Sequence, residues 1–596
     1  MAASRNGLTA LVLALLTVGV LIVPLCQAAA AAADGPGNGD GEAAAVAAAE
    51  PLITAAELRK ARPPRQRTRA TKTPPPPPKS TSSGPVTNAK PPPPNGITFE
   101  GGLSIIFREI SSPLFVFDSS DGVRIPLFIN QTDAEKYLGY KIRIRLTPQD
   151  LPAAWAESEP VPVQDIQIIG TLPSNSQQKE EVGPGGVSQV LIKPVIYTVS
   201  ACGYPAAISP SALRNILVNG PNTPSDAVTM QNAYNYCSQG RVVVNNSNVD
   251  IIEVKLPCTG TTTSPPVRNF NFTPATSSCS MPVYLDMMRI ASDYVKNVLG
   301  RSLAKDQSRM LVVPRELAAF CDWSDQAYII PTATSEAFIN GVYANDLTPY
   351  MRLLGFTNFY LSSARGEPSD FNIDQSSVMG RGRFCFNAPN LWRLGWVSPL
   401  PGGDLNGTTL TIGRPRAFFL PGQNTNPQSY LRINPTWAIT GKEVYNNKTQ
   451  LPLPVFFVAH RYQESALDTF SPPTSSIYVH SYKGTKDRFT IDFSYRVAVL
   501  TGTSRIYRGP YGLVVRLTSS VTSWFGGNAT VVICRASGEM ENVNAESCSD
   551  GLDNDCDGRV DAADSDCANA IRAPSPSPPR RQPSTTTGSS RPTTSG

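Results

Sequence analysis

The stretch that decides the fold is Tyr350–Arg365, which reads YMRLLGFTNFYLSSAR. NGVYANDL (Asn340–Leu347) precedes it. Pro349 suits the first turn of a helix, where its missing N–H costs no hydrogen bond. Asp346 has a side chain that caps helix starts. We therefore predict a helix from Asp346 to about Leu361, and we interpret Asp346 as its cap rather than as a catalytic base.

The segments around this helix resemble the gametolysin family of secreted algal metallopeptidases. NGVYANDL, DQSSVMG (Asp374–Gly380) and CFNAPNLWRLGW (Cys385–Trp396) follow one another at the family's spacing, and the resemblance covers roughly Cys202 to Arg535. It implies a metzincin-type domain whose helix carries the zinc motif HExxHxxGxxH, with Met379 in the Met-turn beneath the zinc.

The sequence departs from this motif at each chemically important position. The places of the three histidines, the glutamate and the glycine are taken by Arg352, Phe356, Ser362, Leu353 and Phe359. Arginine is permanently cationic, a phenyl ring has no donor atom, and leucine accepts no proton. Only two histidines occur, His460 and His480, fewer than a metzincin uses. The resemblance thus indicates a member without peptidase activity, in which zinc is not expected.

Two other catalytic sites are alternatives. Glu367, Asp370 and Asp374 lie on a predicted loop and are interpreted as solvated, although paired carboxylates there would allow acid–base chemistry. His460 and His480 fall on predicted strands and are interpreted as satisfied surface or core residues. A zinc site built from the two is the alternative.

The segment Glu546–Cys567, ESCSDGLDNDCDGRVDAADSDC, is the candidate metal site. Acidic residues occupy positions 1, 3, 5, 9 and 12 of a calcium-loop pattern, with a glycine at position 6 for the sharp turn. The segment also resembles a short metal-binding motif, DGxDNDCDGxxDxxDxDC, of secreted bacterial and algal proteins. Carboxylate oxygens favour calcium; another metal, or a disulfide-stapled acidic turn without metal, is the alternative. The predicted ligands are Asp553, Asp555, Asp557, the carbonyl of Arg559, Asp561 and Asp564.

The chain ends differ in composition from the middle. Arg5 followed by the apolar run Leu8–Leu25 predicts a signal peptide at residues 1–29, with an uncleaved signal anchor as the alternative. Residues 30–95 are basic and Pro-rich, and residues 568–596 are Ser/Thr/Pro-rich; neither has the composition to form a core.

Between these ends we predict an α+β multidomain protein. Residues 96–199 form a β-rich N-terminal domain, and residues 200–401 form the degenerate gametolysin-like domain of mixed α/β order. Residues 402–540 form an antiparallel β-sandwich, and residues 546–567 form the Asp/Cys motif.

An even number of cysteines after the signal predicts a disulfide framework whose pairing spacing does not reveal: Cys202, Cys237, Cys258, Cys279, Cys321, Cys385, Cys534, Cys548, Cys556 and Cys567. Six N-x-[ST] sequons predict N-glycosylation: Asn130, Asn245, Asn271, Asn406, Asn447 and Asn528.

These features predict a secreted glycoprotein of the extracellular matrix or cell wall with a structural or binding role. Its expected partners are wall glycoproteins or polysaccharide. Lys+Arg (52) and Asp+Glu (47) nearly balance, so nucleic acid is not an expected partner. A membrane is a partner only if the signal is uncleaved. The alternatives are an active zinc metalloendopeptidase acting on Hyp-rich wall proteins and a signal-anchored surface protein.

Overall fold

A computed structural model describes residues 96–567 of the chain. Within this range it leaves out residues 109–112, 148, 151–159, 164, 173–179, 183–187, 264–266, 274–278, 280, 305–306, 331–333, 367–373, 444–449, 464–465, 469–474, 487–491, 522–526 and 543–545. The predicted signal peptide (1–29), the basic segment (30–95), the tail (568–596), Glu367, Asp370 and Asn447 therefore lie outside the described residues.

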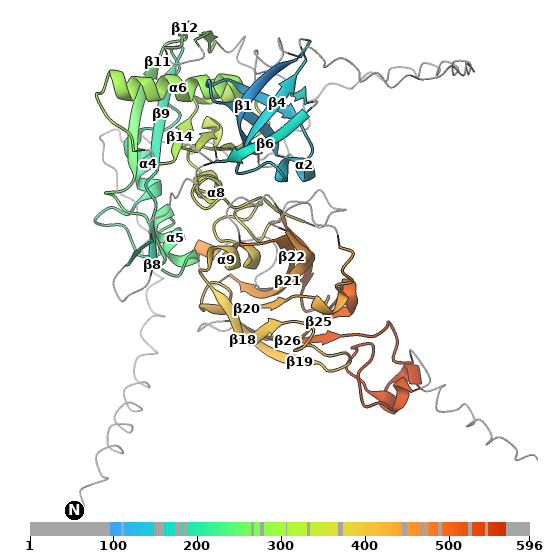
Figure 1. Cartoon of the computed structure of the whole chain (residues 1–596). Coiled ribbons are helices and arrows are strands. Elements are labelled where there is room, and N and C mark those ends of the chain that lie inside the picture. Colours follow the sequence, from blue (N-terminus) through green and yellow to red (C-terminus); the bar gives the residue numbers. More distant parts are fainter. Residues whose placement is uncertain are drawn as a thin grey trace, which may run out of the picture. The chain divides into compact units, whose positions relative to one another are not determined.

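An 11-stranded sheet forms the first part of the molecule (Figure 1). Nine strands follow one another in space: β11 (Asp250–Leu256), β9 (Val195–Ala201), β14 (Arg309–Val312), β16 (Glu336–Ile339), β15 (Asp325–Ile329), β1 (Ile97–Arg108), β2 (Leu114–Ser119), β3 (Arg124–Phe128) and β5 (Val161–Pro162). β4 (Tyr140–Leu146) pairs with β1 and β6 (Asp165–Thr171).

The direction of the strands changes in the middle of this sheet. β11, β9, β14 and β16 run parallel, whereas β15 is antiparallel to β16 and to β1. The register of β1 on β15 places Ile105 opposite Ile329 and Phe107 opposite Ala327. The boundary expected near residue 199 therefore does not separate two sheets, because β1 continues the sheet at its antiparallel strand.

Alternating side chains give this sheet two buried faces. Phe107, Ala327 and Ile329 belong to one apolar cluster, and Ile106 and Tyr328 belong to another. The first face packs against α4 (Pro210–Leu217), α5 (Met230–Cys237), α8 (Leu347–Thr357) and α9 (Ala388–Leu394). The second packs against α6 (Met281–Asn297) and α7 (Arg315–Ala318), and α6 crosses β9 and β11 in Figure 1. A short helix, α2 (Gln131–Glu135), follows β3.

Two further sheets share one core, and all of their strands except β17 follow residue 397. The first has the order β17 (Ala364–Arg365), β23 (Ser494–Leu500), β22 (Ser475–Gly484), β21 (Gln450–Tyr462), β20 (Gln428–Ile433) and β18 (Ser398–Leu405). The second has β19 (Arg416–Pro421), β26 (Asn528–Arg535), β25 (Leu513–Val521) and β24 (Ile506–Arg508). The prediction of an antiparallel sandwich is wrong at the pairing β18–β20, which is parallel; β17, which pairs in parallel with β23, lies before the predicted range.

Two small sheets complete the described strands. They consist of β10 (Val242–Val243), β8 (Ser188–Leu191) and β7 (Glu180–Val182), and of β12 (Thr259–Thr261) and β13 (Asn269–Asn271). Among the residues that the structure describes, no helix combines the length and apolar character needed to cross a bilayer.

All ten cysteines after the predicted signal form disulfides. The pairs are Cys202–Cys258, Cys237–Cys385, Cys279–Cys321, Cys534–Cys556 and Cys548–Cys567. The predicted framework is confirmed, and the structure supplies the pairing that spacing left open. Such a framework is typical of proteins that mature in an oxidising compartment.

Candidate functional site

Helix α8 forms where the sequence predicts it but is shorter. The Asp346 side chain accepts a hydrogen bond from the Thr348 N–H at 2.9 Å, so its predicted role as helix cap is confirmed. The helix ends at Thr357 rather than near Leu361. Tyr360 takes a left-handed conformation (φ 51°), which no helix can continue through. Phe359 occupies the position at which the motif has glycine, and the chain turns at the next residue, Tyr360.

Arg352 sits inside the protein rather than facing a cleft. Its residue is 4% exposed. Nη1 donates to Asp325 Oδ2 at 3.1 Å, and Nε donates to the Val378 carbonyl at 3.0 Å. Asp325 lies on β15 and is fully buried. The guanidinium thus joins the helix to β15 and to the turn that contains Met379, with its charge balanced by a carboxylate.

Phe356 and Leu353 are also packed in the core. The Phe356 ring stacks on the ring of Phe107 with centroids 4.7 Å apart and planes 7° from parallel. Leu353, Phe356 and Phe107 are each less than 5% exposed. Strand β1 therefore covers Phe356, which takes the place of the motif's second histidine, with an aromatic ring. Ser362, also buried, donates its hydroxyl to the Asp492 carbonyl.

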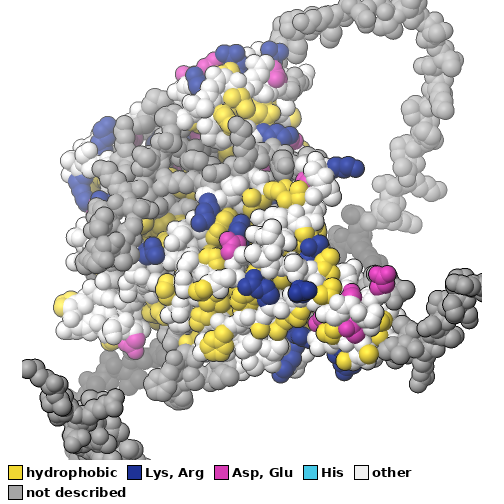
Figure 2. Space-filling model, turned by 60° about the horizontal axis from the view of Figure 1, so that its bottom comes forward, with side chains coloured by type: hydrophobic (Ala, Val, Ile, Leu, Met, Phe, Trp, Pro, Cys, Tyr) yellow, Lys and Arg dark blue, Asp and Glu magenta, His cyan; other side chains and the backbone are white. Residues whose placement is uncertain are grey.

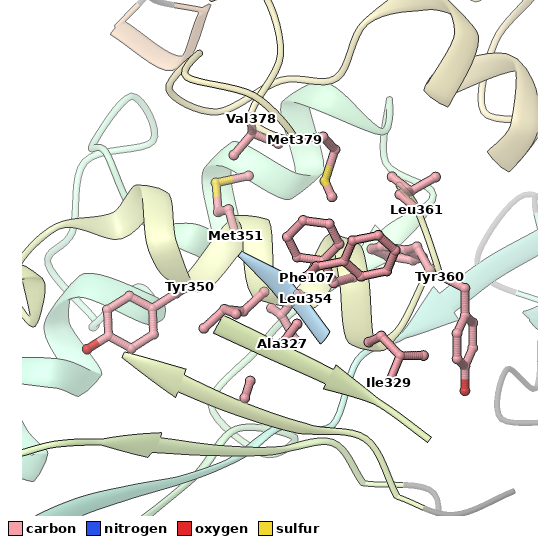
Figure 3. Packing of buried hydrophobic residues seen from close by; sticks show 14 of the residues in the cluster. Phe107, Ala327, Ile329, Tyr350, Met351, Leu354, Tyr360, Leu361, Val378 and Met379 are labelled. Carbon is pink, nitrogen blue, oxygen red and sulfur yellow. The ribbon is translucent and has the colours of Figure 1, made fainter. Parts of the chain in front are cut away.

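Met379 lies against α8. A Cβ at Gly355 would collide with the Met379 sulfur, so the close approach requires glycine. In Figure 3, Met351 and Leu354 of the helix lie between Val378 and Met379 on one side and β15 on the other. The structure thus brings Met379 beneath the helix, while Arg352, Phe356 and Ser362 contact three different partners.

Asp374 is not solvated, and that prediction is wrong. Its residue is fully buried. One oxygen accepts from the Ser376 N–H and hydroxyl at 2.9 and 2.7 Å. The other accepts from Asn387 Nδ2 at 3.1 Å and contacts His480 Nε2 at 2.9 Å. Burial alone would raise the pKa of Asp374, but the His480 charge and these hydrogen bonds hold it well below its usual range.

The comparisons with known proteins bear on this region. The family described as Gametolysin peptidase M11 matches residues 191–506, more than half of the 596 residues. This chain belongs to the gametolysin family. It is similar to a protein named Autolysin from Chlamydomonas reinhardtii, which is 22% identical over 490 residues that cover 68% of this chain and 74% of the relative. No solved structure matches the chain.

The zinc that the gametolysin family implies does not fit the residues found here. A guanidinium, a phenyl ring and a hydroxyl offer no imidazole or carboxylate donor, and zinc in proteins is bound by such nitrogen, sulfur or carboxylate groups. The cation of Arg352 would also repel a metal ion. Of the two histidines, His480 has its Nε2 against Asp374 and Ser376.

His460 is likewise a core residue of this gametolysin-family chain. It is fully buried on β21, and its Nε2 lies 3.0 Å from the Ser475 hydroxyl. Burial lowers its pKa to about 4, so the ring is neutral near pH 7. No group of three potential ligands within the described part of the chain contains a histidine.

Sequence reasoning missed Asp325, Phe107 and His480 as neighbours of this region. Asp325 ends AFCDWSD and begins strand β15, and nothing in the sequence distinguishes it there from a loop residue. Phe107 belongs to a separate predicted domain, and His480 lies 106 residues from Asp374. No local pattern signals these contacts.

The Asp/Cys motif has little regular structure, and turns and disulfides fix its carboxylates. The potential ligand atoms form two groups: Glu541 with Asp553 and Asp555, and Asp555 with Asp557 and Asp564. Within each group the atoms lie within 4.8 Å of one another. Four of the five predicted aspartates thus come together. Asp561 belongs to neither group, because its two carboxylate oxygens accept from the Gly551 N–H at 3.2 and 3.1 Å. Glu541, which sequence reasoning missed, joins from outside the motif.

Burial perturbs these carboxylates. It raises the pKa of Asp553 to about 6, although a hydrogen bond from the Gly558 N–H opposes the shift and the charges of Asp555 and Asp557 add to it. Burial also raises the pKa of Asp555 and of Glu541. Burial thus disfavours the ionised form of these carboxylates.

The sequons that the structure describes are accessible. Asn130 and Asn271 are exposed, and Asn245, Asn406 and Asn528 are partly exposed. Asn130 also lines a cavity of about 610 Å³ with Phe128, Tyr137 and Ile166, among others. The residues that line this cavity come from the strands and helix α2 between residues 128 and 166, not from α8.

Proposed function

We propose that this chain is a secreted glycoprotein of the cell wall or extracellular matrix in which a gametolysin-type domain serves a structural or binding role without peptidase activity. The observation that carries the proposal is the buried ion pair of Arg352 and Asp325. It places a permanent cation at the first ligand position and satisfies it within the core.

The electrostatics of this pair argue against metal binding. A catalytic zinc keeps three protein ligands and an open position for water. Here the pair is 4% and 1% exposed by side chain, so neither water nor a metal reaches it without breaking the core. Breaking a buried ion pair costs several kcal/mol, roughly 3–5. Zinc would have to overcome this cost while gaining no histidine ligand.

The cover of α8 by β1 gives a second reason. An extended peptide commonly binds by adding a strand to the free edge of a sheet. In this chain β1 already pairs with β15 from Ile105 to Arg108. Phe107 on the same strand stacks on Phe356. The chain therefore fills with its own residues the edge and the helix face that a substrate would need.

Secretion and glycosylation rest on separate features. Five disulfides, accessible sequons and the predicted signal at residues 1–29 favour an extracellular protein. On the face in Figure 2, basic side chains are interspersed with hydrophobic and uncharged ones rather than joined in one stripe. This face thus lacks the basic stripe that is typical of nucleic-acid-binding proteins.

The test is a measurement of zinc and of hydrolysis on the purified full-length chain. We expect less than about 0.1 zinc per chain by mass spectrometry after dialysis against micromolar zinc, a level far below a filled site. We also expect no chelator-sensitive cleavage of a Hyp-rich wall extract. Stoichiometric zinc together with such cleavage would overturn the proposal in favour of an active metalloendopeptidase.

A second measurement separates the secreted protein from a surface-anchored one. Sequencing of the mature N-terminus is expected to find a start near Ala29. A mature chain that begins at Met1 and sediments with membranes would instead support the signal anchor. This result would leave the assignment of the peptidase-like domain unchanged.

A further inference from the structure

The Asp/Cys motif gathers several carboxylates, and few basic side chains lie close to them. Glu541, Asp553, Asp555, Asp557 and Asp564 supply five acidic groups. Of the neighbouring arginines, Arg508 approaches Asp555 Oδ2 only to 3.8 Å, and its shorter bond, 2.6 Å, goes to the Asp555 carbonyl. Arg516 likewise donates to the Asp557 carbonyl. The arginines bind the backbone at short distance and compensate the carboxylates only in part, through the long ion pair of Arg508 with Asp555.

Backbone N–H groups hold one oxygen of each of the four aspartates, and Asp564 Oδ1 accepts from the Asp566 N–H at 2.6 Å. Asp553 Oδ2 accepts from Gly558 at 3.0 Å, Asp555 Oδ1 from Asp557 at 3.0 Å, and Asp557 Oδ1 from Arg559 at 2.8 Å. These bonds turn the loop tightly around its own side chains, and Gly558 permits the turn with φ 98°. The second oxygen of Asp555 faces Arg508 at 3.8 Å, whereas that of Asp553 has no hydrogen-bond partner.

Two carboxylate oxygens in this cluster have no hydrogen-bond partner although they are buried. They are Oδ1 of Asp553 and Oδ2 of Asp564, on residues that are 2% and 3% exposed. A buried carboxylate oxygen without a donor is unfavourable by a large amount. Asp553 belongs to one of the two groups and Asp564 to the other; within each group the ligand atoms lie within 4.8 Å of one another, and Asp555 is common to both. A bound cation would satisfy these oxygens.

Glu541 completes the cluster from another part of the chain. It is fully buried, and its carboxylate accepts from the Asn554 N–H at 2.5 Å and from the Asp561 N–H at 2.9 Å. Each carboxylate oxygen has a second lone pair, so both bonds are compatible with metal ligation. Glu541 therefore takes the place near the cluster that the loop pattern assigns to Asp561.

We propose that Asp553, Asp555, Asp557, Asp564 and Glu541 bind one calcium ion, with Asp561 outside its ligand set. Calcium takes six to eight oxygen ligands and accepts irregular arrangements, whereas magnesium demands an octahedron at shorter distances. The carbonyl of Arg559 supplies the backbone ligand of the loop pattern. Because Glu541 follows β26, the ion ties the motif to the sandwich alongside the disulfide Cys534–Cys556.

The proposal does not depend on the function of α8, and the full-length chain tests it. After removal of bound metals with EGTA, calcium titration by calorimetry should show one ion per chain with a Kd between about 10⁻⁷ and 10⁻³ M. Glu541→Gln should weaken binding at least about tenfold, as expected for loss of one charged ligand. Asp561→Asn should change the Kd less than about threefold because it removes no ligand.

Glu539→Gln is the matched control, since Glu539 is exposed and two residues from Glu541; it should leave the Kd unchanged. Circular dichroism and the intact disulfide count establish that each variant is folded. If Glu541→Gln does not fold, Asp553→Asn replaces it.

Three results would overturn the proposal. Absence of binding at about 10 mM calcium, far above the range of extracellular sites, would leave a metal-free acidic turn. Tighter binding of copper or zinc than of calcium would show another metal. A larger loss for Asp561→Asn than for Glu541→Gln would restore the ordinary loop pattern.

Discussion

Helix α8 and the Asp/Cys motif handle buried negative charge in opposite ways. At the helix, the Asp325 carboxylate is neutralised by Arg352 of the same chain. In the motif, five carboxylates form two groups that share Asp555, and the nearby arginines bind backbone carbonyls. The comparison teaches that the family resemblance does not locate the buried charge: the helix that resembles a metal site holds an ion pair of the chain's own residues, while the site proposed for a cation lies in an irregular loop.

The largest expected effect comes from breaking the buried ion pair of Arg352 and Asp325. Arg352→Met leaves Asp325 as an uncompensated buried charge, and the free energy of unfolding should fall by about 3–5 kcal/mol. Urea denaturation with the disulfides intact measures it. The double variant Arg352→Met/Asp325→Leu should recover much of the loss, because replacing both charges by apolar groups is often nearly neutral.

An exposed ion pair provides the control for this experiment. Arg432 and Asp404 lie 2.9 Å apart, but the Asp404 side chain is 56% exposed. Asp404→Asn should cost less than about 1 kcal/mol. Equal losses for Arg352→Met and Asp404→Asn would show that the Arg352–Asp325 pair contributes no more to stability than an exposed ion pair.

Removal of the cation tests the other region. At free calcium 100 times the Kd, binding should stabilise the folded state by about 2.7 kcal/mol relative to the calcium-free protein. The apparent melting temperature of the wild type, followed by calorimetry, should therefore drop on addition of EGTA. In Asp553→Asn, EGTA should have little effect; an equal drop there would place the bound calcium elsewhere.

A smaller effect concerns the aromatic cover of α8. Phe107→Leu keeps an apolar side chain but removes the stacked pair with Phe356, which is worth about 0.5–1.5 kcal/mol beyond burial. Urea denaturation should show a loss of this size. Phe419→Leu, at a residue that is 63% exposed, should show almost none. A loss at Phe419 as large as that at Phe107 would argue against β1 as a packed cover.

The smallest expected effect concerns Glu135. Its buried carboxylate is neutralised by a proton rather than by an arginine or a metal ion. Burial and, secondly, the Asp492 charge raise the pKa of Glu135 to about 7, while hydrogen bonding to Gln131 and the charge of Lys483 oppose the shift. Gln450 Nε2 donates to both carboxylates, at 3.0 and 2.8 Å.

Between pH 4.5 and about 7 the unfolded chain has released this proton and the folded chain retains it. The folded state thus binds more protons, and stability should fall as the pH rises through this window. We expect a slope below about 1 kcal/mol per pH unit, since partial access of water screens the group. The slope of the unfolding free energy should be smaller in Glu135→Gln, and an unchanged slope would assign the dependence to other groups.

Local chemistry made part of this structure predictable. The cap at Asp346 follows from an acidic residue directly before a helix with proline in its first turn. The convergence of Asp553, Asp555, Asp557 and Asp564 follows from their spacing around a glycine that turns the loop. These are contacts among residues close in the chain, where sequence spacing fixes distance.

The remaining contacts depend on the tertiary structure. The burial of Asp374 depends on His480, 106 residues later, and the role of Glu541 depends on the path of the chain after β26. The sequence of β1 predicts a strand but not its partner, since strand pairing is set by the whole sheet. For this reason the sequence separated residues 96–199 from a sheet that they in fact extend.

The pairing of β1 with β15 has a consequence for biosynthesis. Ile105 and Ile329 are paired although about 220 residues separate them. At 5–20 residues per second, β1 leaves the ribosome about 10–45 s before its partner strand. During that interval β1 can pair with β2 and β4, but its segment Ile105–Arg108 still lacks β15 as a neighbour. Nascent chains of this protein should therefore depend on chaperones, and a shortened chain that starts at residue 191 should expose the edge of β15 and aggregate.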